Sequence, residues 1–104
     1  SFGTESDQNK NAPVSSINEK ENGYEVEVEL PGVRKEYIEI RIEKNLLSIS
    51  ATRKKGEMEF SYKRDFKISD EIDSNEIKAS FENGLLVLEL TKKKESEAKK
   101  IEIL

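Results

Sequence analysis

The stretch Ala79-Ser80-Phe81-Glu82-Asn83-Gly84-Leu85-Leu86 decides the fold, because it has the pattern of a strand, a tight turn and a second strand. Asn-Gly is the strongest short signal for a two-residue β-hairpin, since both central residues of a type I′ turn need a positive φ. Apolar residues occupy every second position on both sides of the turn: Ile77, Ala79, Phe81, Leu86, Leu88 and Leu90. This period of two predicts a hairpin with one face in a core.

The same alternation continues on the N-terminal side of this hairpin. It predicts strands at residues 14–17, 24–30, 38–42, 47–51 and 60–68. Turn signals separate them: Glu21-Asn22-Gly23, Pro31-Gly32, Lys44-Asn45 and Lys54-Lys55-Gly56-Glu57. Residues 69–76 form a polar loop with room for one helical turn, and no long helical pattern is present. The expected fold is therefore all-β, an immunoglobulin-like antiparallel β-sandwich.

The chain of 104 residues suits a single domain with flanking segments. Residues 1–13 are polar apart from Phe2, so we expect a disordered N-terminal arm. The alternating pattern occupies residues 14–91, which we take as the domain. Residues 92–104 form a C-terminal extension, in which the charged run 92–100 leads to Ile101-Glu102-Ile103.

Composition argues against several classes of function. The net charge is −4 with both signs interspersed, whereas nucleic-acid binding needs a basic face. The chain has no cysteine and no histidine, so it lacks thiolate chemistry, the commonest general base and the commonest metal ligand. No phosphate-binding glycine-rich loop and no apolar run of membrane-spanning length is visible. We therefore expect no enzyme, no cofactor, no metal, no membrane partner and a cytoplasmic location.

The final isoleucines, Ile101 and Ile103, have two explanations. They are either a short last strand or a disordered end of the same domain, or an apolar motif that binds a neighbouring molecule. The nine mostly charged residues before them span up to roughly 30 Å when extended, which is enough to reach another domain. Burying each isoleucine stabilises by about 1.5–3 kcal/mol, and ordering the tail costs part of that. Such a contact is weak and reversible alone, and many together hold an assembly.

Five motifs appear in an order that resembles the small heat shock protein family, whose members are chaperones built on the α-crystallin domain. The resemblance covers residues 14–104 and is carried by these segments: Glu29-Leu30-Pro31-Gly32-Val33-Arg34-Lys35-Glu36-Tyr37-Ile38, Leu47-Ser48-Ile49-Ser50-Ala51, Tyr62-Lys63-Arg64-Asp65-Phe66-Lys67-Ile68, the A-x-x-x-N-G-x-L signature of Ala79, Asn83, Gly84 and Leu86, and the I-x-I motif of Ile101 and Ile103. The resemblance implies an ATP-independent holdase that binds partly unfolded client proteins and forms homodimers and higher homo-oligomers.

The resemblance also implies roles for three groups of residues. A groove at the edge of the sandwich would accept the I-x-I motif of another subunit, with candidates Ile38, Ile40, Ile42, Ile77, Ala79 and Phe81. The alternative is that these six are simply core. Subunit contacts would involve the strand that contains Phe60, Tyr62, Arg64 and Phe66. Arg64 is either a surface ion pair or a guanidinium paired across that interface.

Two features depart from the family pattern. Ser69 stands where a proline usually follows the arginine strand, and only residues 53–59 separate two strands that a longer loop joins in many members. Because that loop carries a strand exchanged between subunits, the dimer forms either by edge-to-edge pairing or by a minimal exchange. Two rival interpretations are a p23-like co-chaperone and an immunoglobulin-like adhesion or structural module. The absence of Trp and Cys disfavours the latter.

Overall fold

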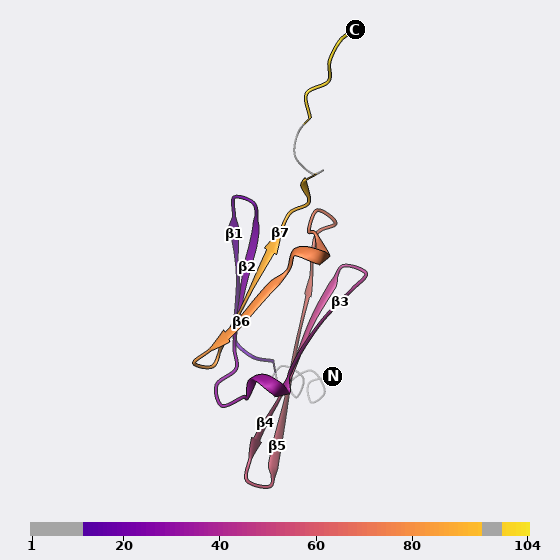
Figure 1. Ribbon diagram of the computed structural model, residues 1–104. Helices are drawn as coiled ribbons and strands as arrows, with labels where there is room; N and C mark the ends of the chain where they lie inside the picture. The colour runs from indigo at the N-terminus through magenta and orange to yellow at the C-terminus, as the bar shows by residue number, and fades with distance from the viewer. Residues whose placement is uncertain (1–11, 95–98) are drawn as a thin grey trace, which may run out of the picture.

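Two antiparallel β-sheets form the body of the protein (Figure 1). The structure, a computed structural model, describes residues 12–94 and 99–104, so the expected disordered arm lies almost wholly outside the described residues. The strands are β1 (Ser15–Lys20), β2 (Gly23–Glu29), β3 (Ile38–Glu43), β4 (Leu46–Lys55), β5 (Met58–Lys67), β6 (Lys78–Glu82) and β7 (Leu85–Thr91). Single 3₁₀ turns are η1 (Lys35–Tyr37) and η2 (Ser74–Glu76). The all-β prediction is confirmed.

The hairpin turns of the sequence analysis are present. Asn83 and Gly84 have φ of 52° and 78° and join β6 to β7, with Glu82 facing Leu85. Lys44 and Asn45 have φ of 50° and 67° and join β3 to β4 in the same way. Positive φ at both central positions is the requirement of a type I′ turn, whose twist matches that of the flanking strands.

The core lies between the two sheets. Its buried apolar side chains are Val26, Val28, Leu30, Val33, Leu47, Ile49, Ala51, Phe66, Ile72, Leu86, Leu88 and Leu90. Val28, Leu47 and Leu88 are fully inaccessible to solvent. Most of the set belongs to β2, β4 and β7, the strands with a neighbour on each side, because central strands are covered best by the opposite sheet.

The β4–β5 hairpin corrects one prediction. Residues 54–57 were expected as a connection, but β4 continues to Lys55 and β5 begins at Met58, so the turn is only Gly56-Glu57. The tip of the hairpin extends past the other strands (Figure 1), and residues 54–59 are all exposed. No opposing sheet covers the tip, so its residues need not alternate between apolar and polar. The hydrophobic pattern of the sequence therefore does not indicate a strand there.

The two sheets have different widths. One has the strand order β1-β2-β7-β6 and the other the order β3-β4-β5. Each sheet therefore has two edge strands with backbone groups on one side that pair with no strand among the described residues. Edge strands are sites where other chains add. The candidate functional surfaces lie along them.

Candidate binding groove and assembly surfaces

The six residues predicted to form a groove lie on or next to β3 and β6, one edge strand from each of the two sheets. Directly facing residues of an antiparallel pair point to the same side of a sheet. Ile40 faces Ile49, and Ala79 faces Leu88; both of these partners are buried in the core. Ile40 and Ala79 therefore point inward, yet Ile40 is only half-buried and Ala79 is exposed. The inward faces of these two edge strands are not covered.

Two adjoining cavities occupy this uncovered edge. One of about 260 Å³ is lined by Ile40, Arg41, Ile42, Leu47, Ser74, Ile77, Ala79 and Leu88. The other, of about 190 Å³, is lined by Lys35, Ile38, Ile40, Ala79, Ser80, Phe81 and Leu86. Ile40 and Ala79 belong to both. We call the surface of Ile38, Ile40, Ile42, Ile77, Ala79 and Phe81 the edge groove, an apolar channel with a few polar residues at its rim.

The tail motif, Ile101-Glu102-Ile103, has no strand structure. Ile101 is 86% exposed and Ile103 is 94% exposed, so within the described residues neither isoleucine is buried by its own chain. Burying either isoleucine against another apolar surface would therefore be favourable. The same chain thus presents an open apolar groove and two unburied isoleucines.

The root of the tail is held to the domain beyond the end of β7. The Lys92 amide donates to the carbonyl oxygen of Asn22 at 2.8 Å, and the Lys93 amide donates to that of Glu71 at 2.7 Å. Lys92 also forms an isolated bridge with Ile72, which is buried. The sequence pattern did not predict this anchor, because hydrogen bonds between backbone groups do not depend on the type of side chain.

The predicted subunit-contact residues are all on β5 but differ in burial. Phe60, Tyr62 and Arg64 are half-buried, whereas Phe66 is buried in the core and faces Leu47. Phe66 therefore has little surface left for a partner. The guanidinium of Arg64 lies 5.5 Å from the centre of the Phe66 ring. Its Nε is buried with no hydrogen-bond partner among the described residues, which is costly unless another molecule supplies one.

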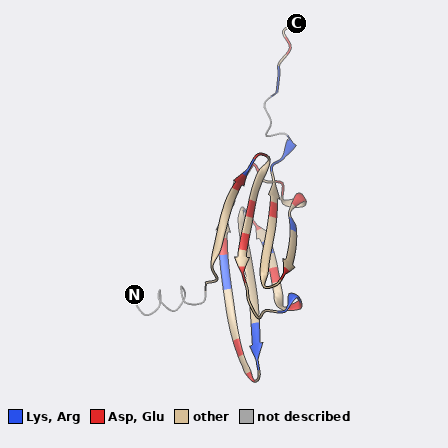
Figure 2. Cartoon of the chain, turned by 90° about the vertical axis from the view of Figure 1, so that its left-hand side faces the viewer, with Lys and Arg blue, Asp and Glu red and all other residues tan. Residues whose placement is uncertain are grey.

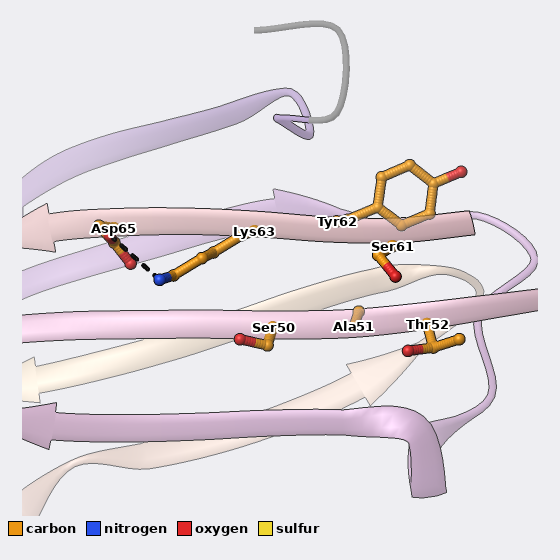
Figure 3. Close-up of a pocket in the computed structure, with 7 residues that line it drawn as sticks. All are labelled: Ser50, Ala51, Thr52, Ser61, Tyr62, Lys63 and Asp65. Atoms are coloured by element: carbon orange, nitrogen blue, oxygen red, sulfur yellow. Dashed lines mark ion pairs between the residues drawn. The ribbon is translucent and has the colours of Figure 1, made fainter. Parts of the chain in front are cut away.

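The outer face of β4 and β5 carries a shallow hollow that sequence patterning did not reveal (Figure 3). Its volume is about 640 Å³, and it is lined by Ser50, Ala51, Thr52, Ser61, Tyr62, Lys63 and Asp65. We call it the outer hollow. Lys63 Nζ lies 4.0 Å from the carboxylate of Asp65 at its side. Ser50, Thr52 and Ser61 have short side chains, which leave this part of the surface unfilled. The alternate spacing of Ser50 and Thr52 along β4 is the sequence signal that could have indicated the hollow.

Comparison with known proteins decides the family. The model of the Hsp20/alpha crystallin family matches residues 16–104. The chain belongs to this family. It is 34% identical over 104 residues to Small heat shock protein C4 of Rickettsia felis, covering 88% of this chain and 64% of that protein. It is 36% identical over 87 residues to the 22.0 kDa heat shock protein of Arabidopsis thaliana, covering 71% of this chain and 45% of that protein.

Solved structures agree with this Hsp20 assignment. A small heat-shock protein from Xylella fastidiosa superposes with a TM-score of 0.75 at 26% identity, covering 88% of this chain and 94% of the other. Heat shock protein 16.0 from Schizosaccharomyces pombe gives a TM-score of 0.70 at 30% identity, covering 89% and 97%. These matches favour the small heat shock interpretation over the p23-like and adhesion alternatives. The chain spans less than two thirds of the two relatives from Rickettsia and Arabidopsis named above.

The surface of this Hsp20 domain carries charges of both signs. Acidic and basic residues occur along the strands of both sheets (Figure 2). Within residues 12–94 and 99–104, no three acidic side chains are grouped as metal ligands would be. Over the same residues, no helix is long and apolar enough to cross a bilayer. The notable surfaces are the edge groove, the tail motif and the free edge of β5.

Proposed function

We propose that this chain is an ATP-independent holdase whose tail motif docks in the edge groove of another copy. One observation carries the proposal: an open apolar groove and two exposed isoleucines belong to the same chain. The groove lies between two edge strands, so an extended segment has both apolar side-chain pockets and free backbone groups to bind. The spacing of Ile101 and Ile103 puts both side chains on the same face of an extended segment.

The energetics of this contact favour exchange. Two isoleucines contribute about 1.5–3 kcal/mol each when buried, and immobilising the tail and its partner offsets much of that. A single docked tail is therefore weak. Several tails in a closed assembly raise one another's effective concentration, so the assembly persists while individual tails detach. Detachment uncovers apolar surface.

That uncovered surface supplies client binding. Partly unfolded proteins expose apolar segments in extended conformations, and these match the edge groove as the tail motif does. The chain's 38% charged residues keep such a complex in solution. The sequence shows no glycine-rich loop for phosphate, so binding and release need no nucleotide. The names of the relatives as heat shock proteins support this role.

An aggregation assay tests the proposed function. A thermally or reductively unfolded client is followed by light scattering with increasing amounts of this chain, with and without ATP. We expect slower aggregation at stoichiometric ratios and no effect of ATP. Absence of protection at several-fold molar excess would contradict the holdase function.

A matched pair of variants assigns the activity to the groove. Ala79→Glu puts a charge at the position shared by both groove cavities, where the native side chain is exposed and the core is left intact. Lys78→Glu, one residue earlier on β6 and outside the groove lining, is the control. Protection should fall with Ala79→Glu and remain with Lys78→Glu. Equal activity of both variants would place client binding elsewhere.

A further inference from the structure

The outer face of the sheet β3-β4-β5 is the side that points away from the core. Successive residues of a strand point to opposite sides, and Leu47, Ile49 and Phe66 point into the core. The outer face therefore carries these residues: Glu39, Arg41, Glu43, Leu46, Ser48, Ser50, Thr52, Ser61, Lys63, Asp65 and Lys67. All the charged residues among them are exposed, so they are free to meet another molecule.

The strand register arranges these side chains in three rows that run across the sheet. Each row takes one residue from each strand, in the order β3, β4, β5: Glu39, Ser50 and Lys63; Arg41, Ser48 and Asp65; Glu43, Leu46 and Lys67. In every row the charges on β3 and β5 have opposite signs, and an uncharged residue of β4 lies between them. The pattern of charge on the β3 side is thus the reverse of the pattern on the β5 side.

We propose that this outer face binds the same face of a second copy of the chain, with a two-fold axis that runs along β4. Rotation about this axis exchanges the β3 side with the β5 side and keeps each row in place. Every charge then lies opposite a charge of the other sign, in pairs of three kinds: Glu39 with Lys63, Arg41 with Asp65, and Glu43 with Lys67. The contact goes beyond the proposed function, because it uses neither the tail motif nor the edge groove.

The middle of the face suits such an approach. Sheets that pack face to face lie about 10 Å apart, a gap that a lysine and a facing glutamate span together. Leu46 lies on the axis and is 39% exposed, so it gains an apolar contact with the same residue of the second copy. Ser50 and Thr52 also lie on the axis, and their short side chains leave the outer hollow between the copies (Figure 3). The hollow gives room for water that bridges the two faces.

A two-fold axis that runs across the strands is less favourable. If it passes through the row of Ser48, then Arg41 and Asp65 each face their own copies and Glu39 faces Glu43. All these are contacts between like charges, which oppose association. An axis between two neighbouring rows pairs only four of the six charges of each copy. Charge complementarity therefore selects the axis along β4.

Ion pairs already present in the protomer strengthen the arrangement. Arg41 Nε lies 3.1 Å from the carboxylate of Glu39, and Lys63 Nζ lies 4.0 Å from that of Asp65. Face-to-face contact places the first pair of one copy over the second pair of the other, which makes clusters of four alternating charges. Networks of charges contribute more than isolated surface pairs. Salt screens them, so we expect the contact to be strongest at low ionic strength.

A zero-length carbodiimide crosslinker tests the arrangement, because it joins a lysine amine directly to a carboxylate in contact with it. The chain with Ile101→Ala and Ile103→Ala is used, so that tail docking is absent, and isotope-labelled and unlabelled chains are mixed. At low ionic strength we expect Lys63–Glu39 and Lys67–Glu43 links that join a labelled chain to an unlabelled one, and their loss in about 1 M salt. Links between chains from Lys63 to Asp65 in their place would contradict the axis, and the absence of links between chains on this face would overturn the contact.

A charge exchange provides an independent test. Over the described residues neither Glu43 nor Lys67 forms an ion pair in its own protomer. Glu43→Lys and Lys67→Glu should each lower the yield of the Lys63–Glu39 link several-fold, and the double variant should restore it to within about twofold. Lys78→Glu, on the other sheet, is the control for net charge and should leave the yield unchanged.

Thermal unfolding shows whether each variant remains folded. No recovery in a folded double variant would contradict the Glu43–Lys67 pair, and an equal loss with Lys78→Glu would reduce the effect to net charge. Client protection is measured on the same variants. Protection that persists when the links are lost separates the holdase function from this contact.

Discussion

The backbone amide of Leu30 donates a hydrogen bond of 2.7 Å to the carbonyl oxygen of Gly84. This bond joins the Leu30-Pro31-Gly32 segment to the Asn83-Gly84 turn, two motifs that are more than fifty residues apart in the sequence. A Cβ at Gly84 would lie 3.0 Å from the Cα of Pro31, a rigid backbone neighbour. Glycine is therefore favoured at position 84 for two reasons: its φ is positive, and the backbone of Pro31 leaves little room for a Cβ.

Gly84 and Gly56 form a natural comparison. Their φ angles are 78° and 62°, so alanine at either position costs about 1–2 kcal/mol in backbone strain. Only Gly84 has a close neighbour, since a Cβ at Gly56 meets nothing within 4 Å. We predict that Gly84→Ala lowers the free energy of unfolding by at least about 1 kcal/mol more than Gly56→Ala does, a difference of roughly 4–8 °C in Tm. If urea unfolding gave the same loss of unfolding free energy for both variants, the backbone at Pro31 would have moved to accommodate the new Cβ at no energetic cost.

The tail isoleucines should contribute to assembly and not to the stability of the domain. Both are almost fully exposed, so Ile101→Ala with Ile103→Ala removes no contact of the protomer. We predict a Tm within about 1 °C of the parent under conditions where the chain is dimeric or monomeric, and the loss of species larger than a dimer. Light scattering after size exclusion measures the mass, with Glu102→Gln as the control. A drop of several degrees would instead make the tail a strand of its own domain.

The point where the tail leaves the domain can be located by hydrogen exchange. The amides of Lys92 and Lys93 are hydrogen-bonded to Asn22 and Glu71. We therefore predict protection of both amides, with fast exchange at Glu102 in dilute samples where tails are undocked. Protection that ends at Thr91 would mean that the anchor opens readily.

Arg64 should matter more to the dimer than to the protomer. Over the described residues Arg64 forms no ion pair within the protomer, and its guanidinium lies near the Phe66 ring, a contact worth about 0.5–1 kcal/mol. Arg64→Ala should thus change Tm little in dilute solution and weaken dimerisation at least about tenfold, as expected when a charged group loses a partner. Arg64→Lys keeps the charge but loses the Nε donor and serves as the comparison. An unchanged dimer dissociation constant in both variants would show that Arg64 takes no part in the subunit contact.

Sequence reasoning located the turns because they depend on local chemistry. Asn83-Gly84 and Lys44-Asn45 are read from two residues, and the structure has both. The local sequence pattern could not predict that the edge groove is exposed to solvent. Ile40 and Ile49 have the same residue type and face each other, yet Ile49 is buried and Ile40 is not. Their difference follows from strand order, which local pattern does not contain.

The β4–β5 hairpin shows a second limit. Its tip lacks alternation because no sheet lies opposite, so a true strand has the composition of a loop. The outer hollow has a related cause. Thr52 and Ser61 are ordinary polar positions in the sequence, and the hollow that they line depends on their facing each other across the β4–β5 ladder.

The most direct test of the tail–groove contact is to place a photo-crosslinking amino acid at position 102. That position lies between the two isoleucines and leaves both unchanged. Isotope-labelled and unlabelled chains are mixed, irradiated and mapped by mass spectrometry. We predict adducts within residues 38–43 or 77–82 that join a labelled chain to an unlabelled one. Adducts confined to a single chain, or to any other segment, would contradict docking of the tail motif in the edge groove of another copy.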